Sequence, residues 1–120
     1  MIQKLSESTG NVLGFRITGE ITKKRREQVS STLAEAIAEH GAIRLLLIIE
    51  PYRDITIGAD GLYENLKFVM PHTQGIEKLA VVGHKVSEGT YMAIFGLFSG
   101  MVVEYFDRAR LEAAWKWVRR

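Results

Sequence analysis

The segment IRLLLII, residues 43–49, decides the fold class of this chain. Apart from Arg44, every residue in it is a large aliphatic side chain. A strand with one face in water alternates apolar and polar residues, whereas a strand of a parallel sheet is covered on both faces and is apolar nearly throughout. The segment therefore predicts a parallel strand that is covered on both faces.

Strand-like segments lie on either side of this run. IEKLAVVG, residues 76–83, is a second buried strand, and MVVEYF, residues 101–106, is a last one. Residues 2–8 and 12–18 form a hairpin around Thr9-Gly10-Asn11, because Gly and Asn tolerate the positive φ of tight turns. The sequence thus predicts about five strands.

Helical segments separate these strands. Thr22 is the expected N-cap of a helix that reaches about Glu39, with Gly41 just past its end. Further helices are expected at about 60–70, ended by Pro71, at 87–98, and after Asp107 as a cap. The order β-β-α-β-α-β-α-β-α predicts an α/β domain of five strands and four helices, built in two or three layers. The strands after the first should be parallel, with the N-terminal strand as an antiparallel edge.

The composition fits a single domain over residues 1–120. The chain is 47% apolar and 25% charged, has no cysteine and carries a formal net charge of +2. Disulfides, thiolate metal sites and cysteine catalysis are excluded, and the charge balance does not indicate nucleic-acid binding. With no secretion signal and no apolar run of membrane-spanning length, we expect a cytoplasmic protein, free or peripheral at a membrane.

The segment SEGTYMAIFGLFSGM, residues 87–101, lacks the polar face of a surface helix. Its small residues line up on one side of the helical wheel, and its large ones cover the rest. Two interpretations remain open. The large side chains pack on the sheet as core, or the small side approaches the domain while the large side faces a cavity, a partner chain or a lipid.

The second interpretation predicts an apolar pocket or lid between the helices at 60–70 and 87–98. Its candidate residues are Leu62, Tyr63, Leu66, Met70, Tyr91, Met92, Phe95 and Phe98. Polar groups at the carboxyl ends of the parallel strands are expected at its mouth, because ligands of open α/β sheets bind there. They are Glu50, Arg53, His84 and Lys85, with Asp54 close by. The alternative for these groups is a solvated loop.

The densest charge run is Lys23-Lys24-Arg25-Arg26. Cations in the first turn of a helix oppose its dipole, so the run carries a local cost. It is either a solvated helix start or a surface for phosphate headgroups or an acidic partner. No aromatic platform accompanies it, which argues against nucleic acid.

Signatures of catalysis are missing from the sequence. The histidines His40, His72 and His84 show no metal-ligand spacing, and neither a Gly-x-Ser-x-Gly elbow nor a Walker loop occurs. A pair of His84 with Asp54 or Glu50 is the only arrangement that would suit an enzyme. We therefore expect no enzymatic activity, no metal and no cofactor.

The chain resembles the SpoIIAA-like family of the STAS and CRAL-TRIO-like fold group. The resemblance rests on short segments in order along nearly the whole chain: Ser8-Thr9-Gly10-Asn11-Val12-Leu13-Gly14, Glu39-His40-Gly41, Glu64-Asn65-Leu66-Lys67-Phe68, Leu79-Ala80-Val81-Val82-Gly83 and Phe106-Asp107. It implies a mixed sheet with helices and a role in binding lipophilic molecules or acting at membranes. STAS proteins use a regulatory phosphoserine, but the corresponding stretch here, residues 56–61, has no serine.

These observations lead to two expected functions. The first is a non-enzymatic module that binds a lipophilic small molecule or a membrane surface. The second is a bacterial STAS-like interaction module without the usual phosphoserine, self-associating as a homodimer through the 87–98 helix.

Overall fold

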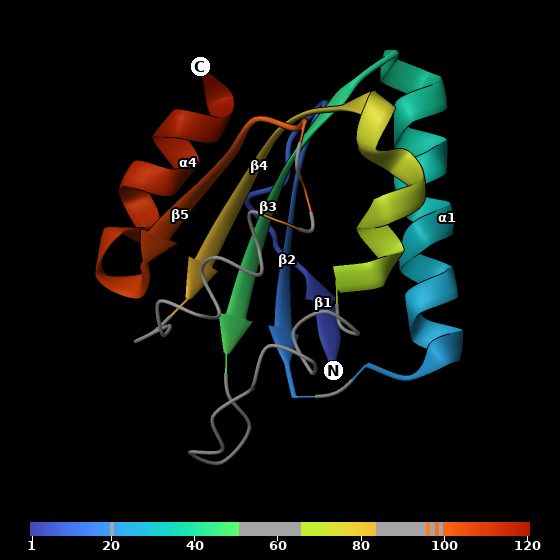
Figure 1. The fold of residues 1–120 in the computed structure, drawn as a ribbon, viewed down its shortest axis with the longest axis horizontal. Helices are drawn as coiled ribbons and strands as arrows, with labels where there is room; N and C mark the ends of the chain where they lie inside the picture. The colour runs from blue at the N-terminus through green and yellow to red at the C-terminus, as the bar shows by residue number, and fades with distance from the viewer. Residues whose placement is uncertain (20, 51–65, 84–95, 97, 99) are drawn as a thin grey trace.

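The computed structural model describes residues 1–19, 21–50, 66–83, 96, 98 and 100–120. Its centre is one five-stranded sheet with the strands in sequence order (Figure 1). The elements are β1 (Ile2–Lys4), β2 (Val12–Thr18), α1 (Lys23–His40), β3 (Ile43–Glu50), η1 (Lys67–Gly75), β4 (Ile76–Gly83), β5 (Val103–Asp107), η2 (Arg108–Arg110) and α4 (Leu111–Arg119). The predicted mixed sheet is confirmed: β1 pairs with β2 antiparallel, and β2 to β5 are parallel.

The consecutive strand order determines which face each helix covers. Right-handed crossovers that always step in the same direction place their helices on one face of the sheet. Accordingly α1, η1 and Phe98 share one buried cluster, on the same face. The helix α4 follows the last strand and is not part of a crossover, so the rule does not apply to it. It covers the opposite face of the sheet (Figure 1). The described elements thus form three layers.

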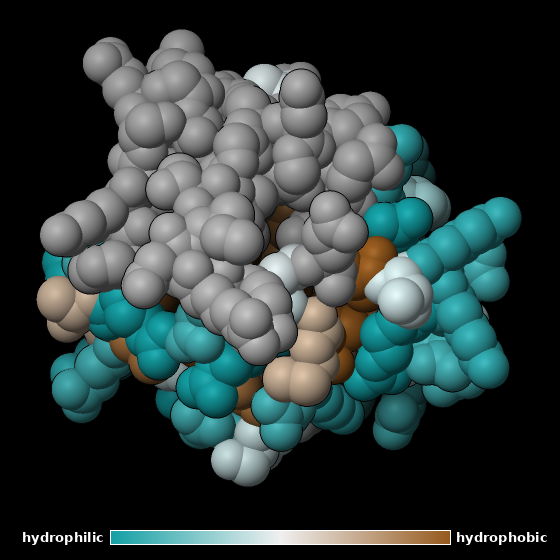
Figure 2. Space-filling view, turned by 90° about the horizontal axis from the view of Figure 1, so that it is seen from below, coloured by the Kyte–Doolittle hydropathy of each residue, from teal (hydrophilic) through white to brown (hydrophobic). Residues whose placement is uncertain are grey.

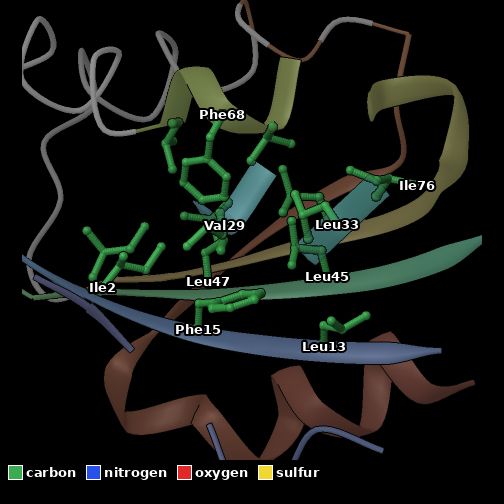
Figure 3. Packing of buried hydrophobic residues seen from close by; sticks show 14 of the residues in the cluster. Ile2, Leu13, Phe15, Val29, Leu33, Leu45, Leu47, Phe68 and Ile76 are labelled. Carbon is green, nitrogen blue, oxygen red and sulfur yellow. The ribbon is translucent and has the colours of Figure 1, made fainter. Parts of the chain in front are cut away.

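The larger core lies between the sheet and α1 with η1. Figure 3 shows Phe15, Leu45 and Leu47 pointing from the strands toward the helices, where Val29 and Leu33 meet them. All these side chains are buried. At roughly 1.5–3 kcal/mol for each large apolar side chain, their burial is the main stabilisation of this layer.

The smaller core lies between the sheet and α4. Leu46 and Ile48 alternate with the residues of the larger core and pack against Trp115 and Val118. The near-continuous apolar run of β3 therefore has the predicted cause, since both of its faces are covered.

The predicted ends of α1 are confirmed. The Thr22 hydroxyl accepts a hydrogen bond from the Arg25 amide, and Gly41 adopts a positive φ of 82° as its amide donates to the Ile37 carbonyl. The cap by Asp107 is also confirmed, because its carboxylate accepts from the Ala109 amide at the start of η2. All three residues satisfy backbone groups that a helix end leaves without partners.

The first strand is shorter than predicted. Its pairing stops at Lys4, where the Leu5 amide donates to the Gly14 carbonyl and the Ser8 amide then closes a turn on Leu5. The Ser8 hydroxyl accepts from the Gly14 amide at 2.9 Å. A side chain thus replaces the backbone partner that a longer strand would have supplied.

The prediction that a helix ends at Pro71 is wrong. The 3-10 helix η1 continues through Pro71 to Gly75. It is held against α1, since Phe68 and Val69 are buried in the larger core and the Cβ position of Gly75 is filled by Ile37, 2.7 Å away. Tertiary packing here outweighs the single hydrogen bond that proline removes.

The ends of two strands differ from the prediction, and one expected helix lies mostly outside the described residues. The last strand is Val103–Asp107 rather than 101–106, and β3 extends one residue beyond the predicted run 43–49, to Glu50. The expected helix 87–98 falls outside the described residues except for Gly96 and Phe98, so three of the four expected helices are represented, one of them as η1.

Candidate functional site

The carboxyl ends of the parallel strands lie along one edge of the sheet. Thr18 is paired with Glu50, and Gly83 with Asp107, at the last positions of their ladders. The connections that carry the predicted lid residues follow directly after Glu50 and Gly83. We call this side of the molecule the carboxyl edge.

A charged cluster stands at the carboxyl edge. Arg16 of β2 and Arg108 of η2 both reach the carboxylate of Glu50, which ends β3. Arg108 Nη1 donates a hydrogen bond to Glu50 Oε1, and Arg16 Nε lies 3.6 Å from the same oxygen. The side chains are 38%, 37% and 28% exposed for Arg16, Arg108 and Glu50, so all three reach solvent. Two guanidinium groups therefore share one carboxylate.

The Arg16 guanidinium is incompletely paired. Its Nε atom is buried and makes no hydrogen bond within the residues that the structure describes. A buried donor without a partner costs free energy, and more so when the group is charged. The cluster therefore holds a donor that its own carboxylate does not satisfy.

The basic first turn of α1 lies near the same edge. The Arg25 guanidinium donates to the carbonyl of Ile2, whose partner in the sheet is Ile17 near the end of β2. Lys23 and Lys24 are exposed, and the first turn contains no acidic residue. The described surface visible in a view onto this edge is mostly hydrophilic (Figure 2). The positive end of the α1 dipole adds to these cations.

Of the predicted site residues, four lie within the described part of the chain. Leu66 is fully buried and Phe98 is 2% exposed, both in the larger core, whereas Met70 is 39% exposed. Glu50 stands at the strand end, as predicted. The others fall outside the described residues: Leu62, Tyr63, Tyr91, Met92, Phe95, Arg53, His84 and Lys85.

The sheet separates these groups. Leu66 and Phe98 pack on the α1 face. Glu50 follows Leu46 and Ile48 in the alternation of β3, so its side chain is on the α4 face. The carboxylate can therefore meet a ligand from the α4 side or at the strand ends.

Arg16 and Arg108 were missed by reasoning from the sequence. Arg16 belongs to none of the motifs in the sequence, and Arg108 follows the predicted cap Asp107. In the register of β2 against β3, Arg16 is paired with Ile48, two residues before Glu50 on the same face. The short helix η2, which directly follows β5, brings Arg108 to the same carboxylate. Neither relation is visible in local sequence.

A second polar contact joins α1 to η1. Ser30 Oγ lies 2.7 Å from His72 Nε2, and both groups are partly buried. Burial lowers the pKa of His72 because the imidazolium is poorly solvated there. Among the described residues, the hydrogen-bond contact of His72 is with Ser30 and with no carboxylate. We interpret it as a structural tie.

The described residues contain neither a metal-binding cluster nor a membrane-spanning helix. No group of three or more His, Asp or Glu side chains among them could hold a metal ion. Across this described part, no helix combines the length and the apolar character that crossing a bilayer requires.

The fold defines a class: an α/β domain with a mixed sheet in consecutive order, helices on both faces and charged groups at the carboxyl edge. The chain belongs to the SpoIIAA-like family, whose profile matches residues 12–119. The earlier resemblance is thereby confirmed.

A solved structure shares the fold. It is an uncharacterized protein of the DUF3478 family with a SpoIIAA-like fold from Shewanella loihica PV-4. The TM-score is 0.64 and the identity 19%, and the match covers 98% of this chain and 93% of that one. At this identity the likeness concerns the fold alone. No protein with curated annotation matches the chain.

Proposed function

We propose that this protein is a non-enzymatic binding module that presents its carboxyl edge to a lipophilic molecule or a membrane surface. The observation that carries the proposal is the gathering of cations at this edge. The first turn of α1 contributes four of them, and the cluster around Glu50 contributes two more.

Electrostatics favours an anionic surface as the target. Each Lys or Arg near an anionic membrane contributes roughly 1 kcal/mol of attraction. Arg25 and Arg26 are tethered through hydrogen bonds to the carbonyls of Ile2 and Ile21, whereas Lys23 and Lys24 are exposed. The two lysines are thus free to approach headgroups on a frame that the arginines stabilise.

Apolar sequence supports a lipophilic ligand. Besides the residues that pack in the larger core, such as Leu66 and Phe98, the segments at 60–70 and 87–98 hold further large apolar side chains. Each segment follows a strand that ends at the carboxyl edge. The cations of this edge would meet the headgroup of such a ligand, and the apolar segments its chain.

Vesicle sedimentation tests the proposal. The wild type should sediment with phosphatidylcholine vesicles that contain phosphatidylglycerol and stay in solution with phosphatidylcholine alone. Lys23→Glu/Lys24→Glu should weaken this binding by more than about tenfold, since it reverses two charges at the edge. Lys116→Glu/Arg120→Glu is the control, with the same change in net charge on α4 and its C-terminus.

A fluorescent fatty-acyl probe, added to delipidated protein, tests the lipophilic ligand directly. Absence of binding to both vesicles and probe by correctly folded protein contradicts the proposal. If sedimentation velocity then shows a dimer that Phe95→Asp dissociates, the interaction module becomes the better interpretation.

A further inference from the structure

We propose that Arg16, Glu50 and Arg108 form a recognition site for an oxyanion, either a carboxylate or a phosphate group. In the unliganded protein, Glu50 takes the place of that anion. The inference rests on the proposed function and deepens it, because it names the chemical group that the carboxyl edge binds.

The charge balance of the cluster is the first reason. Among the described residues, two guanidinium groups face one carboxylate, so this part of the cluster carries a net positive charge. The nearby carboxylate of Asp107 is engaged as the cap of η2 through the Ala109 amide. A guanidinium carries five N–H donors in a planar fork that matches carboxylate and phosphate oxygens. The cluster therefore has both charge and donors to spare for a second anion.

The uneven position of Glu50 is the second reason. Its Oε1 atom accepts a hydrogen bond from Arg108 but lies 3.6 Å from Arg16 Nε, beyond hydrogen-bond distance. When an external oxyanion takes over Arg108, the Glu50 carboxylate can turn to the buried Nε of Arg16. The ligand then satisfies one arginine, and the released carboxylate satisfies the other.

The third reason is the rigid support of the site. Arg16 and Glu50 lie on adjacent paired strands, and Arg108 directly follows the last strand. Groups held by a sheet keep their spacing better than groups on loops, so little ordering is required when the anion binds.

A purely structural role explains the cluster less well. One arginine and Glu50 suffice to tie η2 to the sheet. The second arginine adds a buried donor that has no hydrogen bond among the described residues, and such a donor costs stability. Groups that destabilise the unliganded fold are typical of sites that a ligand completes.

Titration with inorganic phosphate, followed by the NMR signal of the Arg16 Nε–H group, tests the site. Phosphate should shift this signal in the wild type. Glu50→Gln should bind phosphate about tenfold more tightly, because the internal competitor loses its charge, and Arg108→Gln should bind about tenfold more weakly. Arg108→Lys should fall between, since it keeps the charge but loses the fork.

Arg110→Gln is the matched control. It removes the same charge from the same short helix, where Arg110 stacks over Phe106 with 5.7 Å between its guanidinium carbon and the ring centroid. Phosphate affinity should be unchanged in this variant. An equal loss in Arg110→Gln and Arg108→Gln, or no gain in Glu50→Gln, overturns the inference.

Phosphatidylglycerol vesicles distinguish a lipid headgroup from a free anion. If vesicles bind and Arg108→Gln weakens that binding, the site binds lipid headgroups. If phosphate binds as described but neither vesicles nor the acyl probe does, the oxyanion site stands and the proposed function fails. If vesicles bind the wild type and Arg108→Gln equally, and phosphate leaves the Arg16 signal unchanged, the proposed function stands and this inference fails.

Discussion

Gly14 of β2 lies directly against the indole of Trp115. A Cβ atom built on Gly14 would fall 2.5 Å from Trp115 Cη2 and 3.0 Å from Cζ2, closer than real carbon atoms approach. Glycine is required here because its missing side chain lets α4 lie close to the sheet. This contact sets how near the C-terminal helix comes to β2.

Gly14→Ala should therefore lower the free energy of unfolding by about 1–3 kcal/mol, the range for overpacking a core. Urea denaturation measures the loss. Combined with Trp115→Phe, which shortens the ring, the two costs should be less than additive. Gly96→Ala is the control, since no atom of the described residues lies within 4 Å of its Cβ position and little change is expected. Additive costs would show that the two residues do not interfere.

The C-terminal end of α4 is held by cations from the sheet. Arg44 of β3 donates to the Val118 carbonyl at 3.1 Å, and Lys78 of β4 donates to the Trp117 carbonyl at 3.1 Å. Lys78 also lies 5.0 Å from the centre of the Trp117 ring. The last carbonyls of a helix lack partners within it, and cations near them offset the dipole.

Lys78→Met should destabilise the protein by about 1–2 kcal/mol, because it removes charged hydrogen bonds while keeping the aliphatic chain. Lys116→Met, an exposed position on α4, should stay within about 0.5 kcal/mol of the wild type. Thermal unfolding followed by circular dichroism compares them. Equal losses in the two variants would mean that the sheet lysine does not cap the helix.

The lowered pKa of His72 predicts a loss of stability in acid. Between the folded pKa and the ordinary value of 6.5, the unfolded chain binds more protons than the folded chain. The free energy of unfolding should therefore fall as the pH drops from 6.5 toward the folded pKa. Above pH 6.5 His72 should add no pH dependence, because it is neutral in both states. His72→Gln should flatten this dependence in denaturation series at several pH values.

Ser30→Ala separates burial from hydrogen bonding in the same series. It removes the partner of His72 but leaves the imidazole buried, which is the cause of the shift. The acid-side slope should persist in this variant. A slope that vanishes would assign the effect to the hydrogen bond.

The N-cap of α1 should contribute measurably to stability. Thr22→Ala removes the hydroxyl that accepts from the Arg25 amide and should cost about 1 kcal/mol. Thr32→Ala, at a half-buried position inside the same helix where the hydroxyl bonds back to the Gln28 carbonyl, should be neutral or stabilising because alanine is the better helix former. Chemical denaturation measures the free energy of unfolding of both variants. Equal changes in the two would show that the Thr22 hydroxyl does not stabilise the helix start.

Local sequence was sufficient for the elements whose causes are local. The apolar runs at 43–49 and 76–83 predicted β3 and β4 because a short, nearly continuous apolar run is typical of a parallel strand covered on both faces. Thr22 and Asp107 predicted helix starts because a side-chain oxygen satisfies nearby amides. The effect of Pro71 was misjudged, since contacts of η1 with residues distant in sequence outweigh the lost hydrogen bond.

The sequence by itself determined the order of the strands along the chain, the mixed sheet and the family, because the periodicity and caps that mark the elements act over short distances. It also placed Glu50 at a strand end. Only the tertiary structure decided that Arg16 and Arg108 meet that carboxylate. Arg16 is 34 residues before Glu50 and Arg108 is 58 after it, so strand register and chain return, rather than any local pattern, bring their charges together.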